Sequence, residues 1–165
     1  MDLTQKIKDA KSETEKYDLF AHNLYTPVDY FSLSYEELII AVKAGHRLKW
    51  FPKRLQTLEI CEIAIGINGE NLRDVSKKYI SEELCYKAVE SSPLAIRYVP
   101  DQLLDNSLIE YAVKHHARAF VWIEDQKRVT FELCLLAVGK DGSLLSYVPA
   151  KYKKRSELLM TAVKS

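Results

Sequence analysis

Apolar residues return along most of the chain with a period of about 24 residues. An Ala-Val or Ala-Ile pair marks the period, with its Ala at residues 41, 64, 88, 112, 137 and 162. The spacings between successive marks are 23, 24, 24, 25 and 25 residues. The two most similar copies are S-E-E-L-C-Y-K-A-V-E-S-S-P-L-A-I-R-Y-V-P at 81–100 and T-F-E-L-C-L-L-A-V-G-K-D-G-S-L-L-S-Y-V-P at 130–149. A near-constant period of this length predicts a stacked array of small units.

Each copy is predicted to begin with an α-helix. Leu84, Cys85, Ala88 and Val89 of the best copy fall on one stripe of a helix with 3.6 residues per turn. The Ala row indicates that a neighbouring helix packs closely there. Residues that favour helix N-caps stand seven positions before five of the six marks, at Ser34, Thr57, Ser81, Asp105 and Thr130.

A second, shorter helix is predicted in each complete copy. Glycines or Ser-Pro break the first helix, and pieces of five or six residues follow at 93–98, 117–122 and 143–147. This length fits either an α-helix or a three-ten helix. An aromatic residue closes most copies, at Trp50, Tyr98, Trp122 and Tyr147, and three of these segments then end at Pro52, Pro100 and Pro149. The second copy departs from this pattern, because Asp74-Val75-Ser76 replaces aromatic-Val-Pro.

The pattern predicts an all-α protein, a short α-solenoid of about five and a half repeats over residues 34–165. Residues 1–33 contain a polar helix followed by a richer apolar stretch. They are interpreted as an N-terminal helix and cap, or as a degenerate repeat, with a docked irregular arm as the alternative.

Composition narrows the class of protein. The chain has 165 residues, 47% of them hydrophobic and 28% charged, which excludes a disordered chain. Its apolar runs are shorter than the ~18 residues of a membrane span, and its first residues lack a signal-peptide core. We therefore expect a cytoplasmic protein without a membrane partner. The formal net charge of +1 provides no overall attraction to nucleic acid.

The three cysteines are expected in the core. Cys61, Cys85 and Cys134 occupy the row that Leu38 and Ile109 fill in other copies. Stacked helices lie about 8–10 Å apart, too far for a disulfide across this row. The sequence has no Cys-x-x-Cys pair and no His in the row. No metal or other cofactor is therefore expected.

Cations recur in the connectors between copies. They stand after the aromatic position and before the next cap, so a solenoid would align them along one edge. This edge could contact phosphates or an acidic protein, or it could be a solvated edge beside the acids of the next helix. The residues are Lys53, Arg54, Lys77, Lys78, Lys127, Arg128, Lys153, Lys154 and Arg155.

Two further groups are candidates for binding a protein partner. One belongs to the rows just before the marks, which are too apolar for a fully solvated face: Tyr86, Tyr111, Leu135 and Met160. These rows are either covered by the second helices or exposed for a partner. The other group lies in the loop after the fourth helix: His115, His116 and Arg118. His46 occupies the equivalent loop of the first copy, and simple surface residues are the alternative.

No catalytic template fits the chain. It has no Gly-x-Ser-x-Gly, Walker loop, Gly-x-Gly-x-x-Gly or His-Glu-x-x-His motif. The sequence is therefore interpreted as a non-catalytic, protein-binding scaffold. A stoichiometric inhibitor or immunity-type protein is the narrower hypothesis, and a nucleic-acid-binding repeat protein using the basic edge is the alternative.

The units Leu84–Pro100 and Leu133–Pro149, with L-x-x-x-A-V followed by Y-V-P, resemble a family of bacterial, protist and viral tandem repeats of unknown function. Their period is also similar to that of leucine-rich variant repeats, which alternate α and three-ten helices. These resemblances imply a right-handed superhelix. This chain lacks the cysteine cluster of the variant repeats, so no iron–sulfur centre is implied, and neither family supplies catalytic residues.

Overall fold

The computed structural model describes residues 2–125 and 127–164, and within them the chain forms helices and no strand. The α-helices are α1 (Leu3–Asp9), α2 (Glu13–Ala21), α3 (Tyr35–Lys43), α4 (Leu58–Ile67), α5 (Glu82–Ser91), α6 (Asn106–His115), α7 (Phe131–Lys140), α8 (Ala150–Lys153) and α9 (Ser156–Lys164). The three-ten helices are η1 (Tyr30–Ser32), η2 (Leu48–Trp50), η3 (Lys53–Leu55), η4 (Gly69–Asp74), η5 (Lys77–Tyr79), η6 (Pro93–Tyr98), η7 (Asp101–Leu103), η8 (Ala117–Trp122) and η9 (Gly142–Tyr147). None of the helices in these ranges combines the length and apolar character needed to cross a bilayer.

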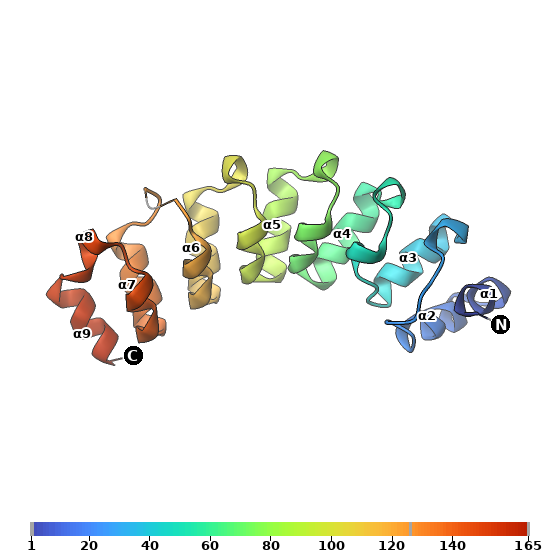
Figure 1. Cartoon of the computed structure of the whole chain (residues 1–165), viewed down its shortest axis with the longest axis horizontal. Helices are drawn as coiled ribbons and strands as arrows, with labels where there is room; N and C mark the ends of the chain where they lie inside the picture. Colours follow the sequence, from blue (N-terminus) through green and yellow to red (C-terminus); the bar gives the residue numbers. More distant parts are fainter. Residues whose placement is uncertain (1, 126, 165) are drawn as a thin grey trace.

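The elements follow one another in space in the order of the sequence. Helices α3, α4, α5, α6 and α7 each contact the next, and α7 contacts α9. Figure 1 shows them along an open, shallow arc with the two ends of the chain far apart. The connectors that carry η3, η5 and η7 come to the same outer edge of this arc in the view. Equivalent positions of successive copies are thus presented along common edges.

The predicted helix starts are confirmed. The side-chain oxygens at all five predicted N-caps accept a hydrogen bond from the backbone N–H three residues on. Each such cap is worth about 0.5–2 kcal/mol. Ser34 forms a complete capping box with Glu37. The short second helices are three-ten helices, which resolves the alternative that the sequence left open, and η6 and η8 have the predicted bounds.

The predicted apolar stripe forms the core. Leu84, Cys85, Ala88 and Val89 are at most 2% exposed, and their counterparts in α4 and α6 are equally buried. The stripe is only partly buried at α9, where Leu158 is inaccessible but Leu159 and Val163 expose 43% and 88% of their surface. Burial of the stripe therefore comes from neighbouring units rather than from the helix itself.

Gly69 lets η4 approach α5 more closely than any other residue could. A Cβ atom at this position would lie 1.8 Å from the carbonyl oxygen of Ala88 and 2.8 Å from its carbonyl carbon. Ala88 is the register mark of the third copy, so this contact joins η4 to the middle of the next helix. A Cβ at Gly66, in α4, would meet no atom within 4 Å.

The N-terminal helices are fixed to α3 by an ion pair. The Lys16 ammonium lies 2.6 Å from the Glu37 carboxylate, and Glu37 is buried. Burial raises the pKa of Glu37. The hydrogen bonds from Lys16 and from the backbone N–H of Ser34 lower this pKa and outweigh the effect of burial, so the net shift is downward. This pair explains why a glutamate stands in a row that other copies fill with leucine or isoleucine.

His46 is buried, although its loop position suggested a surface residue. Its Nδ1 lies 2.7 Å from the Tyr30 hydroxyl, and its Nε2 lies 3.2 Å from the Phe20 carbonyl oxygen. Burial lowers the pKa of His46 below its ordinary value, and the hydrogen bond to Phe20 offsets part of this effect. A neutral imidazole satisfies both contacts, by accepting from Tyr30 and donating to Phe20.

We expect Gly69→Ala to lower the free energy of unfolding by about 1–3 kcal/mol, because the new methyl group meets backbone atoms of α5. Gly66→Ala is the matched control, and we expect it to raise stability by about 0.5–1 kcal/mol, since alanine favours the helix interior. Urea unfolding followed by circular dichroism measures both. Equal effects of the two substitutions would contradict the close approach.

We expect acid to destabilise the protein partly through His46. Its folded pKa is lowered, so the unfolded chain binds more protons at pH values between that folded pKa and the unfolded value of about 6.5. Stability should therefore fall as the pH drops below about 6.5. His46→Gln keeps both hydrogen bonds without titrating, so urea midpoints should depend less on pH in this variant. An unchanged pH dependence would show that His46 does not contribute.

Candidate functional site

The three-ten helices that follow the α-helices pack side by side, and four of them end in an aromatic residue. Contacts join η2 to η4, η4 to η6, η6 to η8 and η8 to η9. Trp50, Trp122 and Tyr147 expose 49%, 44% and 55% of their surface, while Tyr98 is half-buried. Side chains at the same place in adjacent three-ten helices therefore form a row along the array.

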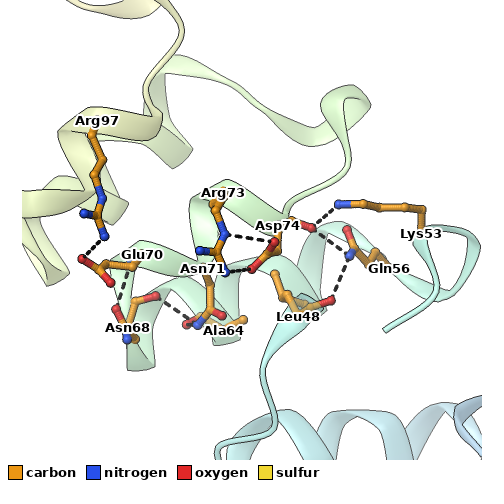
Figure 2. Close-up of polar contacts among 10 residues, drawn as sticks. All are labelled: Leu48, Lys53, Gln56, Ala64, Asn68, Glu70, Asn71, Arg73, Asp74 and Arg97. Atoms are coloured by element: carbon orange, nitrogen blue, oxygen red, sulfur yellow. Dashed lines mark hydrogen bonds and ion pairs between the residues drawn. The ribbon is translucent and has the colours of Figure 1, made fainter. Parts of the chain in front are cut away.

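Arginine side chains connect neighbouring rings of this row. The Arg97 guanidinium lies 4.7 Å from the ring centroid of Tyr98 and 5.2 Å from that of Trp122. The Arg73 guanidinium lies 5.8 Å from the Tyr98 ring. In Figure 2, Arg97 reaches back to Glu70 of η4, with 2.9 Å between Nη2 and Oε1. We call Arg73, Arg97, Tyr98, Trp122 and Tyr147 the aromatic–arginine row.

Arg118 lies beside the C-terminal end of the aromatic–arginine row. With Trp122 and Tyr147 it lines a shallow hollow of about 370 Å³. Its Nε lies 3.8 Å from the Asp141 carboxylate. Arg118, a predicted partner-binding residue, thus lies near Trp122 and Tyr147, which the sequence pattern indicated only as the ends of repeat units. The sequence contained a signal for this row, because a large aromatic residue recurs at the same position near the end of most copies.

The first two connectors bring four cations of the predicted basic edge together. We call Lys53, Arg54, Lys77 and Lys78 the connector cations. They line an open groove of about 680 Å³ with the apolar side chains of Leu72, Val75 and Ile80. Arg73 and Tyr98 also line this groove. The groove and the aromatic–arginine row are therefore adjacent parts of one surface.

The remaining connectors do not extend this groove. The Arg128 guanidinium donates to the carbonyl oxygens of Leu104 and Asp101. The Lys153 ammonium donates to the carbonyl oxygen of Ser146 at 2.7 Å. These hydrogen bonds secure the local backbone of the later connectors. The other residues of the predicted edge, Lys127, Lys154 and Arg155, are exposed.

A buried glutamine joins the two connectors beneath the groove. Gln56 is only 1% exposed. Its Nε2 donates to the carbonyl oxygens of Asp74 and Leu48 at 3.0 and 3.5 Å. Its Oε1 accepts from the backbone N–H and the hydroxyl of Ser76 at 2.8 and 3.0 Å. Figure 2 shows Lys53 and Gln56 converging on the backbone of Asp74.

This arrangement explains the unusual second copy. Ser76 stands where three other copies have proline, at Pro52, Pro100 and Pro149, and proline has no N–H to donate to Gln56. Gln56 itself stands where the other copies have leucine, isoleucine or valine. The two departures are thus one feature, a polar link between connectors. Asp74 replaces the aromatic residue of the row, and its carboxylate pairs with Arg73 at 3.1 Å.

The other predicted partner-binding residues are dispersed. The Tyr86 hydroxyl donates to the Asp105 carboxylate at 2.6 Å, and this hydrogen bond raises the pKa of Tyr86 to about 12. Because Asp105 caps α6, Tyr86 connects two successive helices. Tyr111 stacks on His115 with ring centroids 4.3 Å apart. His116 and Met160 are exposed, and Leu135 is half-buried.

The described residues offer few clusters of side chains that could bind a metal ion or carry out catalysis. Across residues 2–125 and 127–164, no three His, Cys, Asp or Glu side chains gather closely enough to hold a metal ion. A hollow of about 250 Å³ between α6 and α7 contains Glu110 and Glu132 beside Arg128. The thiols of Cys61, Cys85 and Cys134 are free and buried, and burial raises the pKa of each to about 11.

Comparisons of the chain with protein-family models, curated proteins and solved structures find no match. The resemblance to tandem repeats therefore stays a prediction from the sequence.

We expect Gln56→Leu to lower the free energy of unfolding by about 1–3 kcal/mol, because it leaves the buried N–H of Ser76 without a partner and removes one of the two hydrogen bonds to the carbonyl of Asp74. Gln102→Leu makes the same chemical change at an exposed position of η7 and should alter stability by no more than about 0.5 kcal/mol. Urea unfolding compares the two variants. A Gln56→Leu protein as stable as the control would show that the link does not stabilise the connectors.

Proposed function

We propose that this protein is a non-catalytic, protein-binding helical-repeat scaffold. In this proposal the chain is a short right-handed α-solenoid of about five and a half sequence repeats, and one edge of it holds a partner. The observation that carries the proposal is the aromatic–arginine row. Its Trp, Tyr and Arg side chains are the residue types that dominate binding energy at protein interfaces.

The geometry of the row supports a rigid contact surface. Arg97 is held by Glu70 and by two rings, so it would lose little conformational freedom on binding. Trp122 and Tyr147 line one hollow with Arg118 and two serines, which offers a partner side chain both aromatic rings and polar groups. Large rings and a fixed guanidinium along one edge favour a protein ligand over a small metabolite.

The narrower form of the proposal is a stoichiometric inhibitor or immunity-type protein acting in the cytoplasm. Its support is the size of the chain and the lack of a catalytic motif in its 165 residues. A protein of this kind acts by covering a surface of its target at equal stoichiometry.

A nucleic-acid-binding function is the alternative. The connector cations favour it, because phosphate groups are attracted to clustered Lys and Arg. The third connector counts against it, since Asp101 interrupts the line of cations there. Base-reading repeats also need variable polar side chains at a fixed helical position. The candidate rows here are apolar and rich in tyrosine.

We expect tagged protein to retain one protein partner at near-equal stoichiometry from nuclease-treated host lysate. Replacing both Trp122 and Tyr147 by alanine should weaken binding by about a hundredfold or more, because hot-spot residues each contribute at least about 2 kcal/mol. Mass spectrometry identifies the partner, and titration with the purified partner measures the affinity.

The matched control replaces Tyr17 and Tyr25, two exposed tyrosines outside the row, by alanine. This variant should retain the partner. Thermal unfolding of both variants checks that the fold is kept. Capture of nucleic acid alone, or equal loss of the partner in both variants, would contradict the proposed function.

A further inference from the structure

The connector cations carry charge that the described part of the chain does not neutralise. None of the four has a carboxylate within ion-pair distance among residues 2–125 and 127–164. The acids that begin the next helices do not pair with them. Glu59 accepts from the Tyr35 hydroxyl, and Glu83 pairs with Lys87 of its own helix.

Neutral groups hold three of these cations in place. Lys53 donates to the carbonyl oxygen of Asp74. The Arg54 guanidinium lies 4.0 Å from the ring centroid of Phe31. The Lys78 ammonium lies 4.6 Å from the Tyr79 ring. Such contacts position a cation and leave its charge uncompensated. The groove therefore presents a fixed positive rim above an apolar floor.

The lining of the groove defines the chemistry of its occupant. Leu72, Val75 and Ile80 favour apolar side chains, and the connector cations favour carboxylates. Neighbouring helices lie about 8–10 Å apart, and an extended peptide rises about 3.3 Å per residue. Carboxylates about three residues apart would therefore reach successive connectors.

Two observations favour a peptide over a nucleic acid. The groove is confined to the first two connectors, and the exposed Lys127 and Lys154 of the later connectors lie outside it. The third connector also carries Asp101, which would repel a phosphate backbone. A short acidic segment needs only the local groove, whereas an extended polyphosphate needs a continuous track of cations.

We propose that the groove between the first two connectors is the docking site for an acidic segment of the protein partner, with carboxylates on the connector cations and an apolar side chain on Val75 and Ile80. This inference rests on the proposed function. Because Arg73 and Tyr98 belong to both the groove and the aromatic–arginine row, one partner can cover both surfaces.

The test uses fluorescence anisotropy with three labelled probes. The first is a short peptide of repeated Glu-Glu-Leu, the second is its Gln-Gln-Leu counterpart, and the third is an oligothymidylate of matched charge. At near-physiological salt, the full-length protein should bind the glutamate peptide at least about tenfold more tightly than either other probe.

Charge reversal locates the site. Lys77→Glu with Lys78→Glu should weaken binding of the glutamate peptide by about tenfold or more. Lys127→Glu with Lys154→Glu makes the same change in net charge at exposed positions outside the groove. This control should bind within about twofold of the wild type, since screening weakens distant exposed charges.

Three outcomes would overturn the inference: equal binding of the two peptides, tighter binding of the oligothymidylate, or equal losses in the two charge-reversal variants. The two proposals also fail separately. If the native partner is lost by the Trp122 and Tyr147 variant but kept by the Lys77 and Lys78 variant, the groove assignment is wrong and the scaffold function stands. If the glutamate peptide binds as expected and no protein partner exists, the groove chemistry stands and the scaffold function is wrong.

Discussion

Helices α3 to α7 depend on their neighbours to bury their apolar stripes. The stripe that is nearly inaccessible in α4, α5 and α6 is open to solvent at Leu159 and Val163 of α9. A unit with one α-helix and a short three-ten segment has too little surface to enclose a core, so stability arises at the contacts between units. At Gly69 the backbone of η4 meets the backbone of the next helix. The fold thus requires close packing between successive units.

The same requirement explains why candidate binding residues collect on edges. The stripe occupies one face of each α-helix, and the caps occupy its start. The ends of the three-ten helices and the connectors remain free to vary. In the second copy, Gln56 replaces the apolar residue of other copies and forms hydrogen bonds with Ser76. The exchange keeps two connectors aligned while an aspartate takes the place of the aromatic residue. A charged groove can exist there because its floor is fixed by polar bonds beneath it.

The sequence predicts the local structure well because that structure depends on local chemistry. The five N-caps, the four-residue stripe and the bounds of η6 and η8 follow from residues a few positions apart. The position of His46 was predicted less well, because its burial depends on Phe20 and Tyr30, which are distant in the sequence. The predicted basic edge does not form one continuous groove, because its shape also depends on contacts between residues distant in the sequence. Lys53 and Arg128 both lie in connectors and both donate to backbone carbonyls, yet Lys53 lines the groove and Arg128 lines the hollow between α6 and α7. Sequence position identifies an edge, and tertiary packing decides which cations line one groove.

The three buried cysteines can report on local opening of the helices that carry them. Each thiol is shielded and has a pKa of about 11, so a thiol-modifying reagent can react only when the surrounding unit opens. Cys61, Cys85 and Cys134 lie in α4, α5 and α7. Repeat arrays need not unfold as one body, and their ends can open before their middle. Modification rates at the three cysteines would therefore map the opening free energy along the chain without any engineered label.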